Sequence, residues 1–157
     1  MVNENKKKVA VIGCGFFATN HILSWKNFKD VDLVGVCDLD EERAINASNL
    51  AKGTPYFTDA ESMLKEVRPD VVDIVTTAPS HYNLAKLAAS LNIPAIIQKP
   101  MAPSLKEAAK IVDLAEKTKT PMMVHENFRF QKPLRDLQKI ISNGDLNCEI
   151  NSLYATS

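Results

Sequence analysis

The chain has little of what would mark a metal-binding, membrane-spanning or nucleic-acid-binding protein. Its three cysteines, Cys14, Cys37 and Cys148, form no CxxC pair and no spacing typical of a metal site. Lys+Arg and Asp+Glu both number 19, so no positive charge favours nucleic acid as a partner. No apolar run reaches the roughly 20 residues that span a membrane. We therefore expect a cytoplasmic protein with reduced thiols that binds neither nucleic acid nor a membrane.

Short apolar runs alternate with longer amphipathic ones along the chain. The apolar runs predict buried strands, at residues 8–14, 31–38, 55–59, 71–77, 95–99 and 121–127. The amphipathic runs predict helices, at residues 16–28, 40–51, 58–66, 80–91, 104–115 and 134–142. Thr58 with Glu61, and Ser104 with Glu107, have the spacing of capping boxes. This alternation predicts an α/β fold, a doubly wound parallel sheet of the Rossmann type with helices on both faces.

The first predicted strand continues into a GxGxxA pattern, residues 13–18, which opens a helix. Gly13 permits a tight turn, Gly15 lets backbone approach a pyrophosphate, and Ala18 lets the helix pack closely on the strand. The helix N-terminus then offers N–H donors to phosphates. Glycines also serve ordinary turns, but their place at a strand-to-helix junction favours a dinucleotide site. Phe16 and Phe17 either cover the dinucleotide or belong to the core.

Asp38 ends the second predicted strand. An acidic residue at that place accepts hydrogen bonds from the adenosine ribose and repels a 2′-phosphate. The alternative is that Asp38 caps the next helix, a role that Asp40 is also placed to fill. Leu39 and Asp40 follow directly, and neither receives a phosphate as an arginine would. The sequence therefore predicts NAD rather than NADP as the cofactor.

Polar residues also follow the fourth and fifth predicted strands. In the stretch TTAPSHYN, residues 76–83, Pro79 and Ser80 make a helix entry whose loop can cover the ribose and phosphates of a cofactor. His81 either points into the cleft or sits in the first helical turn. The fifth strand ends in Gln98 and Lys99. Because a lysine is almost never buried without a partner, this strand delivers an ammonium group to the rim of the sheet.

Five ordered stretches, VAVIGCGFFATNH, VCDLDEERA, TTAPSHYN, QKP and HENFRF, make nearly the whole chain resemble the N-terminal domain of the Gfo/Idh/MocA oxidoreductases. That family includes glucose–fructose oxidoreductase and inositol dehydrogenase. The resemblance implies hydride transfer between a nicotinamide cofactor and a sugar, inositol or related alcohol. It also implies that Lys99 is the catalytic lysine near the nicotinamide. Glu126, Asn127 and Arg129 would lie near the nicotinamide or bridge to a further domain, although they could also be solvated residues at a strand exit.

The candidate site combines both lines of argument. No metal is expected in it, and Lys99 is its candidate catalytic residue. The candidate cofactor-binding residues are Gly13, Gly15, Phe16, Phe17, Ala18, Asp38, Thr77, Ala78, Pro79, His81, Gln98, Lys99, Asn127 and Arg129.

The chain departs from the family pattern in two ways. Gln98 stands where the family usually has a glutamate, which removes a negative charge beside Lys99. Family members also continue into a sheet domain that closes the substrate pocket. We therefore expect residues 1–145 to be the dinucleotide-binding domain and residues 146–157 to begin a truncated α+β sheet domain. The chain would then be a fragment with little activity alone.

Two other functions stay open at this point. The chain is either a natural non-catalytic dinucleotide-binding or regulatory module, or a short enzyme that completes its site through a partner chain. The segment NCEINSLYATS, residues 147–157, predicts a strand without a visible partner. Because an unpaired strand recruits another edge, a homodimer through this segment is one expectation, and a frayed tail is the other.

Overall fold

The computed structural model describes residues 6–143, which fall into two compact units divided after His125. The first unit is built on a six-stranded sheet with the order β3-β2-β1-β4-β5-β6, in which every neighbouring pair is parallel. This confirms the predicted doubly wound parallel sheet. The strands are β1 (Lys7–Ile12), β2 (Val31–Cys37), β3 (Tyr56–Phe57), β4 (Val71–Ile74), β5 (Ala95–Gln98) and β6 (Met122–His125).

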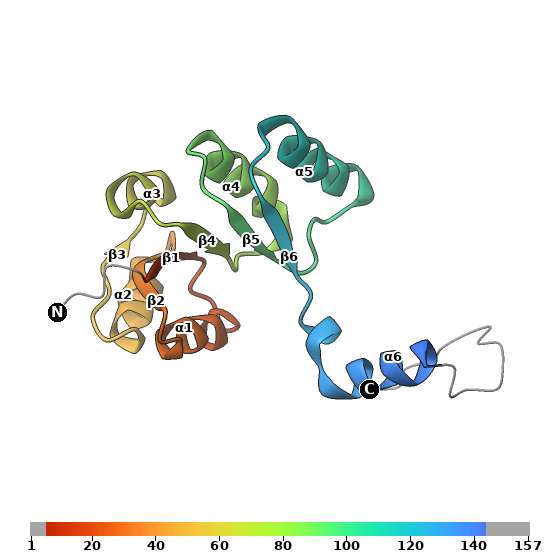
Figure 1. The fold of residues 1–157 in the computed structure, drawn as a ribbon. Helices are drawn as coiled ribbons and strands as arrows, with labels where there is room; N and C mark the ends of the chain where they lie inside the picture. The colour runs from red at the N-terminus through yellow and green to blue at the C-terminus, as the bar shows by residue number, and fades with distance from the viewer. Residues whose placement is uncertain (1–5, 144–157) are drawn as a thin grey trace. The chain divides into compact units, whose positions relative to one another are not determined.

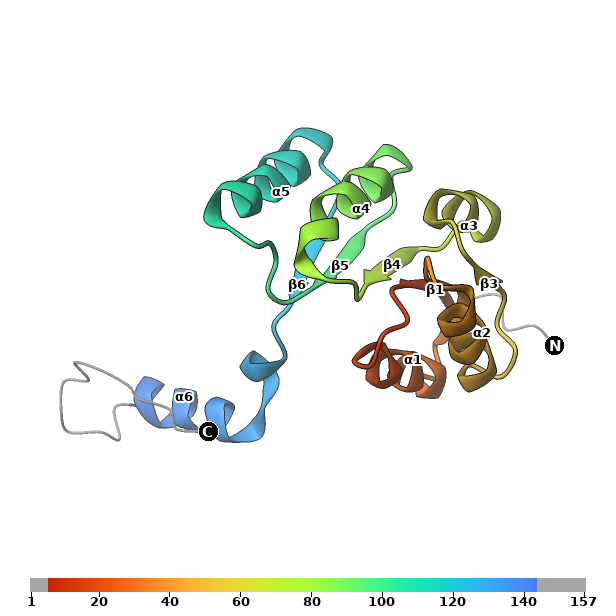
Figure 2. The ribbon, with the colours of Figure 1, turned by 180° about the vertical axis from the view of Figure 1, so that it is seen from behind.

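Helices cover both faces of this sheet, as Figures 1 and 2 show from opposite sides. Helices α1 and α2 pack on one face, and α3, α4 and α5 pack on the other. The chain therefore changes face between β1–β2 and β4–β5, which places the switch point of the sheet between β1 and β4. The helices are α1 (Ala18–Asn27), α2 (Glu41–Leu50), α3 (Ala60–Val67), α4 (Ala78–Ser90) and α5 (Leu105–Thr118).

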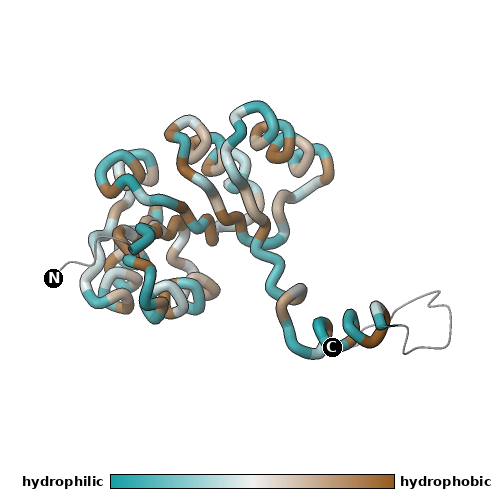
Figure 3. The backbone as a smooth tube through the Cα atoms, viewed as in Figure 1, coloured by the Kyte–Doolittle hydropathy of each residue, from teal (hydrophilic) through white to brown (hydrophobic). Residues whose placement is uncertain are grey.

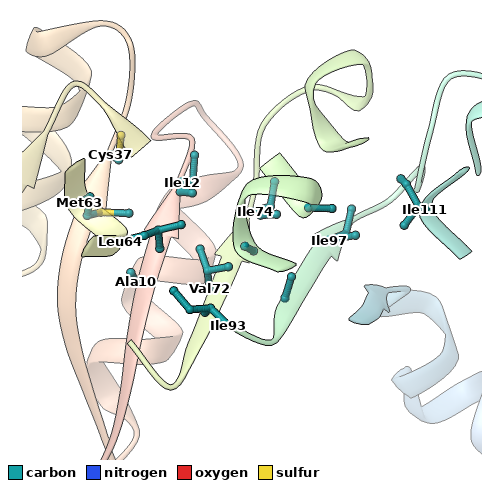
Figure 4. Close-up of a cluster of buried hydrophobic side chains, with 13 residues drawn as sticks. Ala10, Ile12, Cys37, Met63, Leu64, Val72, Ile74, Ile93, Ile97 and Ile111 are labelled. Atoms are coloured by element: carbon teal, nitrogen blue, oxygen red, sulfur yellow. The ribbon is translucent and has the colours of Figure 1, made fainter. Parts of the chain in front are cut away.

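The core lies between the sheet and its helices. Ile12, Ile74 and Ile97 lie in register on three adjacent strands and face α3, α4 and α5 (Figure 4). On the opposite face, Val11 and Ile22 belong to the cluster that α1 and α2 cover. Figure 3 shows the result, with hydrophobic residues concentrated in the central strands of this unit and alternating with polar ones along its helices. Burial on both faces explains why these strands read as nearly continuous apolar runs.

The helix starts differ from two of the sequence-based predictions. Helix α3 is capped by Asp59, which accepts the Ser62 N–H at 2.7 Å, so the capping box predicted at Thr58 is wrong. Aspartate is the stronger cap, and it stands one residue nearer the helix. Helix α4 begins at Ala78 rather than Ser80 because a proline is tolerated in the first turn. At Ser104 the cap itself is confirmed, since its hydroxyl accepts the Glu107 N–H at 3.3 Å, while the Glu107 carboxylate accepts the Ser104 hydroxyl rather than its backbone N–H.

The second unit, described over residues 126–143, is helical. A 3₁₀ helix (Asn127–Phe130) leads into α6 (Lys132–Ser142). The predicted sixth strand therefore ends at His125, two residues earlier than expected, because the Glu126 carboxylate accepts the Phe128 N–H and starts a helical turn. The strand predicted within residues 147–157 lies outside the described residues, so the domain boundary at 145 and the paired edge stay predictions. Over residues 6–143, every helix is too short or too polar to cross a membrane.

Candidate active site

The loop between β1 and α1 has a backbone geometry that fits the roles predicted for its two glycines. Gly13 has φ +95°, and a Cβ there would lie 2.8 Å from the backbone N of Thr76, so this position requires glycine. A Cβ at Gly15 would instead meet nothing within 4 Å. That open space is what a pyrophosphate needs to approach the backbone. Ala18 is buried and packs with Val11, which brings α1 close to β1.

A cavity of about 680 Å³ lies at the carboxyl ends of β1, β2, β4 and β5. This is the end of an open α/β sheet at which ligands bind, and the volume suits a small-molecule ligand. Eight of the predicted residues line the cavity: Gly13, Gly15, Phe16, Phe17, Asp38, Thr77, Gln98 and Lys99. Phe16 is almost fully exposed and Phe17 is 40% exposed, so neither is a core residue, and that they cover the dinucleotide stays a prediction.

Further lining residues were missed by the sequence reasoning, although helical spacing could have found several of them. Ser80, Asn83 and Leu84 line the cavity and lie on one face of α4, at positions i, i+3 and i+4. Leu39 and Arg43 line it near the start of α2. A prediction of α4 that began at Pro79 and followed this period would have named the first three.

Asp38 joins the end of β2 to the glycine loop. Its Oδ2 accepts the Cys14 N–H at 2.7 Å, and its Oδ1 accepts the Asp40 N–H at 3.0 Å. Asp40 is the residue that caps α2, through the Arg43 N–H at 3.2 Å. The helix-capping alternative for Asp38 is therefore answered by Asp40. Each carboxylate oxygen of Asp38 retains further acceptor capacity, which fits hydrogen bonds from two ribose hydroxyls.

Two free thiols, Cys14 and Cys37, lie at the same end of the site, and Cys37 lines the cavity. Burial, then the Asp38 charge and the neighbouring Cys37, raise the pKa of Cys14 to about 12. Burial, then the charges of Asp59 and Asp38, raise the pKa of Cys37 to about 11. Both side chains are therefore protonated at neutral pH and act as small, nearly apolar groups. Neither has the low pKa that a nucleophilic cysteine requires.

The other end of the cavity is formed by the end of β5. Lys99 is exposed and lines the cavity, whereas Gln98 is buried, with 6% of its surface exposed. The Lys99 N–H donates to the Gln98 Oε1 at 2.7 Å, and the Gln98 Nε2 lies 2.9 Å from the Nε2 of His21. The His21 Nδ1 in turn lies 2.7 Å from the Oδ2 of Asp73. Buried side chains from β4 and α1 are thus linked, through Gln98, to the backbone of the candidate lysine.

His81 lies beneath the site, in the first turn of α4. It is fully buried, its Nε2 is 3.0 Å from the Thr76 carbonyl oxygen, and its Nδ1 is 3.1 Å from the Met101 carbonyl oxygen. Of its two open alternatives, the structure shows the helical one, and His81 does not line the cavity. It ties the loop after β4 to the loop after β5. Direct contact of His81 with a cofactor stays an untested prediction.

The remaining candidates lie elsewhere. Ala78 and Pro79 form the first turn of α4 and do not line the cavity. Asn127 and the backbone of Arg129 belong to the 3₁₀ helix of the second unit. The assignment of these four residues to the cofactor site therefore stays a prediction.

The strand order, the glycine loop and the acidic end of β2 define a dinucleotide-binding Rossmann domain. The family model GFO_IDH_MocA, described as "Oxidoreductase family, NAD-binding Rossmann fold", matches residues 7–126. The chain therefore belongs to this oxidoreductase family, its cofactor is NAD, and the resemblance noted in the sequence is confirmed.

Two curated relatives and one solved structure show what the chain is similar to. The chain is 42% identical over 138 residues to a D-apiose dehydrogenase from Paraburkholderia graminis, covering 87% of this chain and 36% of the relative. A D-apiose dehydrogenase from Rhizobium rhizogenes is 38% identical over 143 residues, covering 91% of this chain and 41% of the relative. A solved oxidoreductase from Agrobacterium radiobacter, in complex with NAD+, L-tartaric acid and magnesium, superposes with a TM-score of 0.84 at 38% identity, covering 88% of this chain and 41% of that chain. The chain thus spans about two fifths of the length of these proteins.

Proposed function

We propose that this chain is the cofactor-binding part of a dehydrogenase that moves a hydride between NAD and a sugar, inositol or related alcohol. The observation that supports this most directly is the cavity that has Asp38 and the glycine loop at one end and Lys99 at the other. The relatives named as D-apiose dehydrogenases support a sugar as the substrate class. Nicotinamide, when bound, supplies the hydride chemistry, and the protein orients the reactants.

Each end of the cavity has its own task in this proposal. Backbone N–H groups of the loop at Gly15 hold the pyrophosphate, and the Asp38 carboxylate accepts hydrogen bonds from the adenosine ribose hydroxyls. Thr77, at the start of α4, lies against the phosphates and ribose. Phe16 and Phe17 cover the bound cofactor. The Lys99 ammonium donates a hydrogen bond to the reacting oxygen of the substrate and stabilises the charge that develops there.

One lining residue bears on the choice between NAD and NADP. Arg43 carries the kind of charge that would attract a 2′-phosphate, but its Nε lies 3.4 Å from the Oδ2 of Asp40. That exposed pair offsets the arginine charge in part, and Asp38 adds a negative charge at the same end. Both observations support a preference for NAD.

A calorimetric titration tests this proposal. The chain is titrated with NAD, NADH, NADP and NADPH under one salt condition. We expect NAD(H) to bind in the micromolar range or tighter and NADP(H) to bind at least about tenfold more weakly. Tighter binding of NADPH than of NADH would contradict the assignment of Asp38.

We propose that the hydride transfer takes place only in a longer protein that contains this chain and completes the substrate pocket. Since the chain spans 36–41% of its relatives, we expect little oxidation of D-apiose or other sugars by this chain alone. A longer protein that contains this chain and binds NADH, yet oxidises no sugar or polyol, would instead support a non-catalytic binding module.

Light scattering tests the proposed homodimer. The proposal predicts a dimer for the full chain and a monomer after truncation at residue 144. A cytoplasmic location, which the free thiols Cys14 and Cys37 support, completes the proposal.

A further inference from the structure

A row of buried polar groups leads from the middle of the sheet to the candidate lysine. It begins at Asp73 on β4, passes through His21 on α1, and ends at Gln98 on β5, next to Lys99. The three side chains are at most 7% exposed, so water does not substitute for the contacts between them. His21 and Gln98 stand 77 residues apart in the sequence. The row is therefore a product of the fold rather than of a local motif.

The contacts in this row fix the role of every atom. The backbone N–H of Lys99 can only donate, so the oxygen of the Gln98 amide must face it. The amide nitrogen then faces the His21 Nε2 and donates to it, which requires that this ring nitrogen carry no proton. The proton of the neutral ring is therefore on Nδ1, from which it is donated to the Oδ2 of Asp73.

The surroundings of His21 agree with a ring held in one orientation. Trp25 donates from its Nε1 to the same Asp73 Oδ2 at 2.6 Å, and the Asp73 Oδ1 is buried without a hydrogen-bond partner. The two donors thus converge on one carboxylate oxygen. The His21 ring also meets the ring of His125 on β6, with centroids 4.7 Å apart, and that of Phe17, with centroids 5.5 Å apart. The titratable groups that the structure records against His21 are thus Asp73 and His125.

We propose that His21 is a positioning residue for the lysine end of the site, and that Gln98 sets it as a neutral ring with its proton on Nδ1. His21 holds the Gln98 amide, and that amide holds the backbone of Lys99. A second proton on the ring would set two donors against each other at Gln98. Rotation of the amide would only move the conflict to the Lys99 N–H. A glutamate at position 98 would accept from both sides and allow the doubly protonated ring.

Nitrogen-15 NMR of the imidazole rings tests the proton assignment directly. The chain has three histidines, and the signals lost in His21→Asn assign those of His21. Between pH 6.5 and 7.5 we expect the pattern of a neutral ring protonated on Nδ1. In Gln98→Glu we expect the pattern of an imidazolium at the same pH. A neutral ring protonated on Nε2, or an imidazolium in the native chain, would overturn the proposal.

A binding comparison tests the positioning role, which rests on the proposed binding of NAD. NADH and ADP-ribose are titrated into the native chain, His21→Leu and Gln98→Leu, with circular dichroism as the check on folding. Loss of one buried hydrogen bond at the nicotinamide end should weaken NADH binding about fivefold in either variant and leave ADP-ribose within about twofold. Trp25→Phe is the matched control, because it also removes a donor to Asp73 but does not touch Gln98.

The outcomes separate the two proposals. Equal weakening of NADH and ADP-ribose in both leucine variants would indicate a merely structural role and overturn the positioning of Lys99. Unchanged NADH binding in a folded Gln98→Leu would overturn it as well, even if His21→Leu does not fold. A native chain that binds neither ligand would contradict the proposed function, whereas the NMR measurement would still decide the state of His21.

Discussion

The two ends of the cavity are built from different kinds of contact. At the adenosine end the backbone does most of the work, since Gly13 donates its N–H to the Cys37 carbonyl at 2.8 Å and Asp38 accepts the Cys14 N–H. At the lysine end, side chains from β4, α1 and β5 form a buried row that ends at Lys99. The adenosine end therefore depends on the backbone conformation, whereas the lysine end depends on which side-chain atoms carry protons.

The largest effect is expected from a substitution that distorts the backbone at the adenosine end. In Gly13→Ala the new Cβ would lie 2.8 Å from the Thr76 N and the Val75 C, and φ is +95°. Because backbone atoms cannot move aside cheaply, we expect the free energy of unfolding to fall by about 2–4 kcal/mol. Urea denaturation measures this change, and NADH binding should be lost with it.

Gly15→Ala is the matched control for that prediction. A Cβ there meets nothing within 4 Å, so the free energy of unfolding should change by less than about 1 kcal/mol. The Cβ would, however, occupy the space proposed for the pyrophosphate, and NADH should bind at least about tenfold more weakly. Equal stability losses in the two variants would contradict the separate roles of the two glycines.

The next effect concerns cofactor choice at the same end. Asp38→Asn keeps an oxygen that can accept the Cys14 N–H but removes the charge that opposes a 2′-phosphate. We expect NADH binding to weaken about tenfold and the preference for NADH over NADPH to narrow, as measured by calorimetry. In the control Asp40→Asn, the asparagine oxygen can still accept the Arg43 N–H and cap α2. The preference for NADH over NADPH should therefore be unchanged. If both variants narrowed the preference equally, the effect would belong to the general charge around Arg43.

The same contrast explains how much could be predicted from the sequence. The parallel sheet, the glycine loop and the place of Asp38 follow from strand periodicity and from residues next to one another in the chain. The row through His21 could not be predicted in that way, since it joins residues 52 and 77 positions apart and depends on how α1 lies across β4 and β5. The errors in the predicted helix ends were small and had local causes. At α3, for example, the cap is Asp59, one residue after the predicted Thr58.

A smaller effect is expected from the lysine itself. Lys99→Met keeps the aliphatic part of an exposed side chain, so the free energy of unfolding should change by less than about 1 kcal/mol. The lost charge should change the affinity for NADH two- to fivefold, leave ADP-ribose unchanged, and abolish turnover in a longer protein with a complete pocket. Lys106→Met, an exposed lysine that does not line the cavity, is the control. A large loss of stability in Lys99→Met alone would indicate a structural ion pair.

The smallest expected effect is a change in how steeply the free energy of unfolding falls at high pH, and it concerns the two thiols at the adenosine end. The pKa values of Cys14 and Cys37 are raised from 9.0 to about 12 and about 11, so the folded chain keeps protons that the unfolded chain releases. This contribution to stability is fully present below about pH 9 and is lost as the pH rises toward the folded pKa values. Urea denaturation at pH 8, 9 and 10, in a Cys148→Ser background, should show the free energy of unfolding falling with pH. Replacing Cys14 and Cys37 with alanine should flatten that slope, because lysines and tyrosines titrate in both proteins alike. An unchanged slope would mean that the two thiols are as free to ionise in the folded chain as in the unfolded one, and that the adenosine end is wetter than its contacts imply.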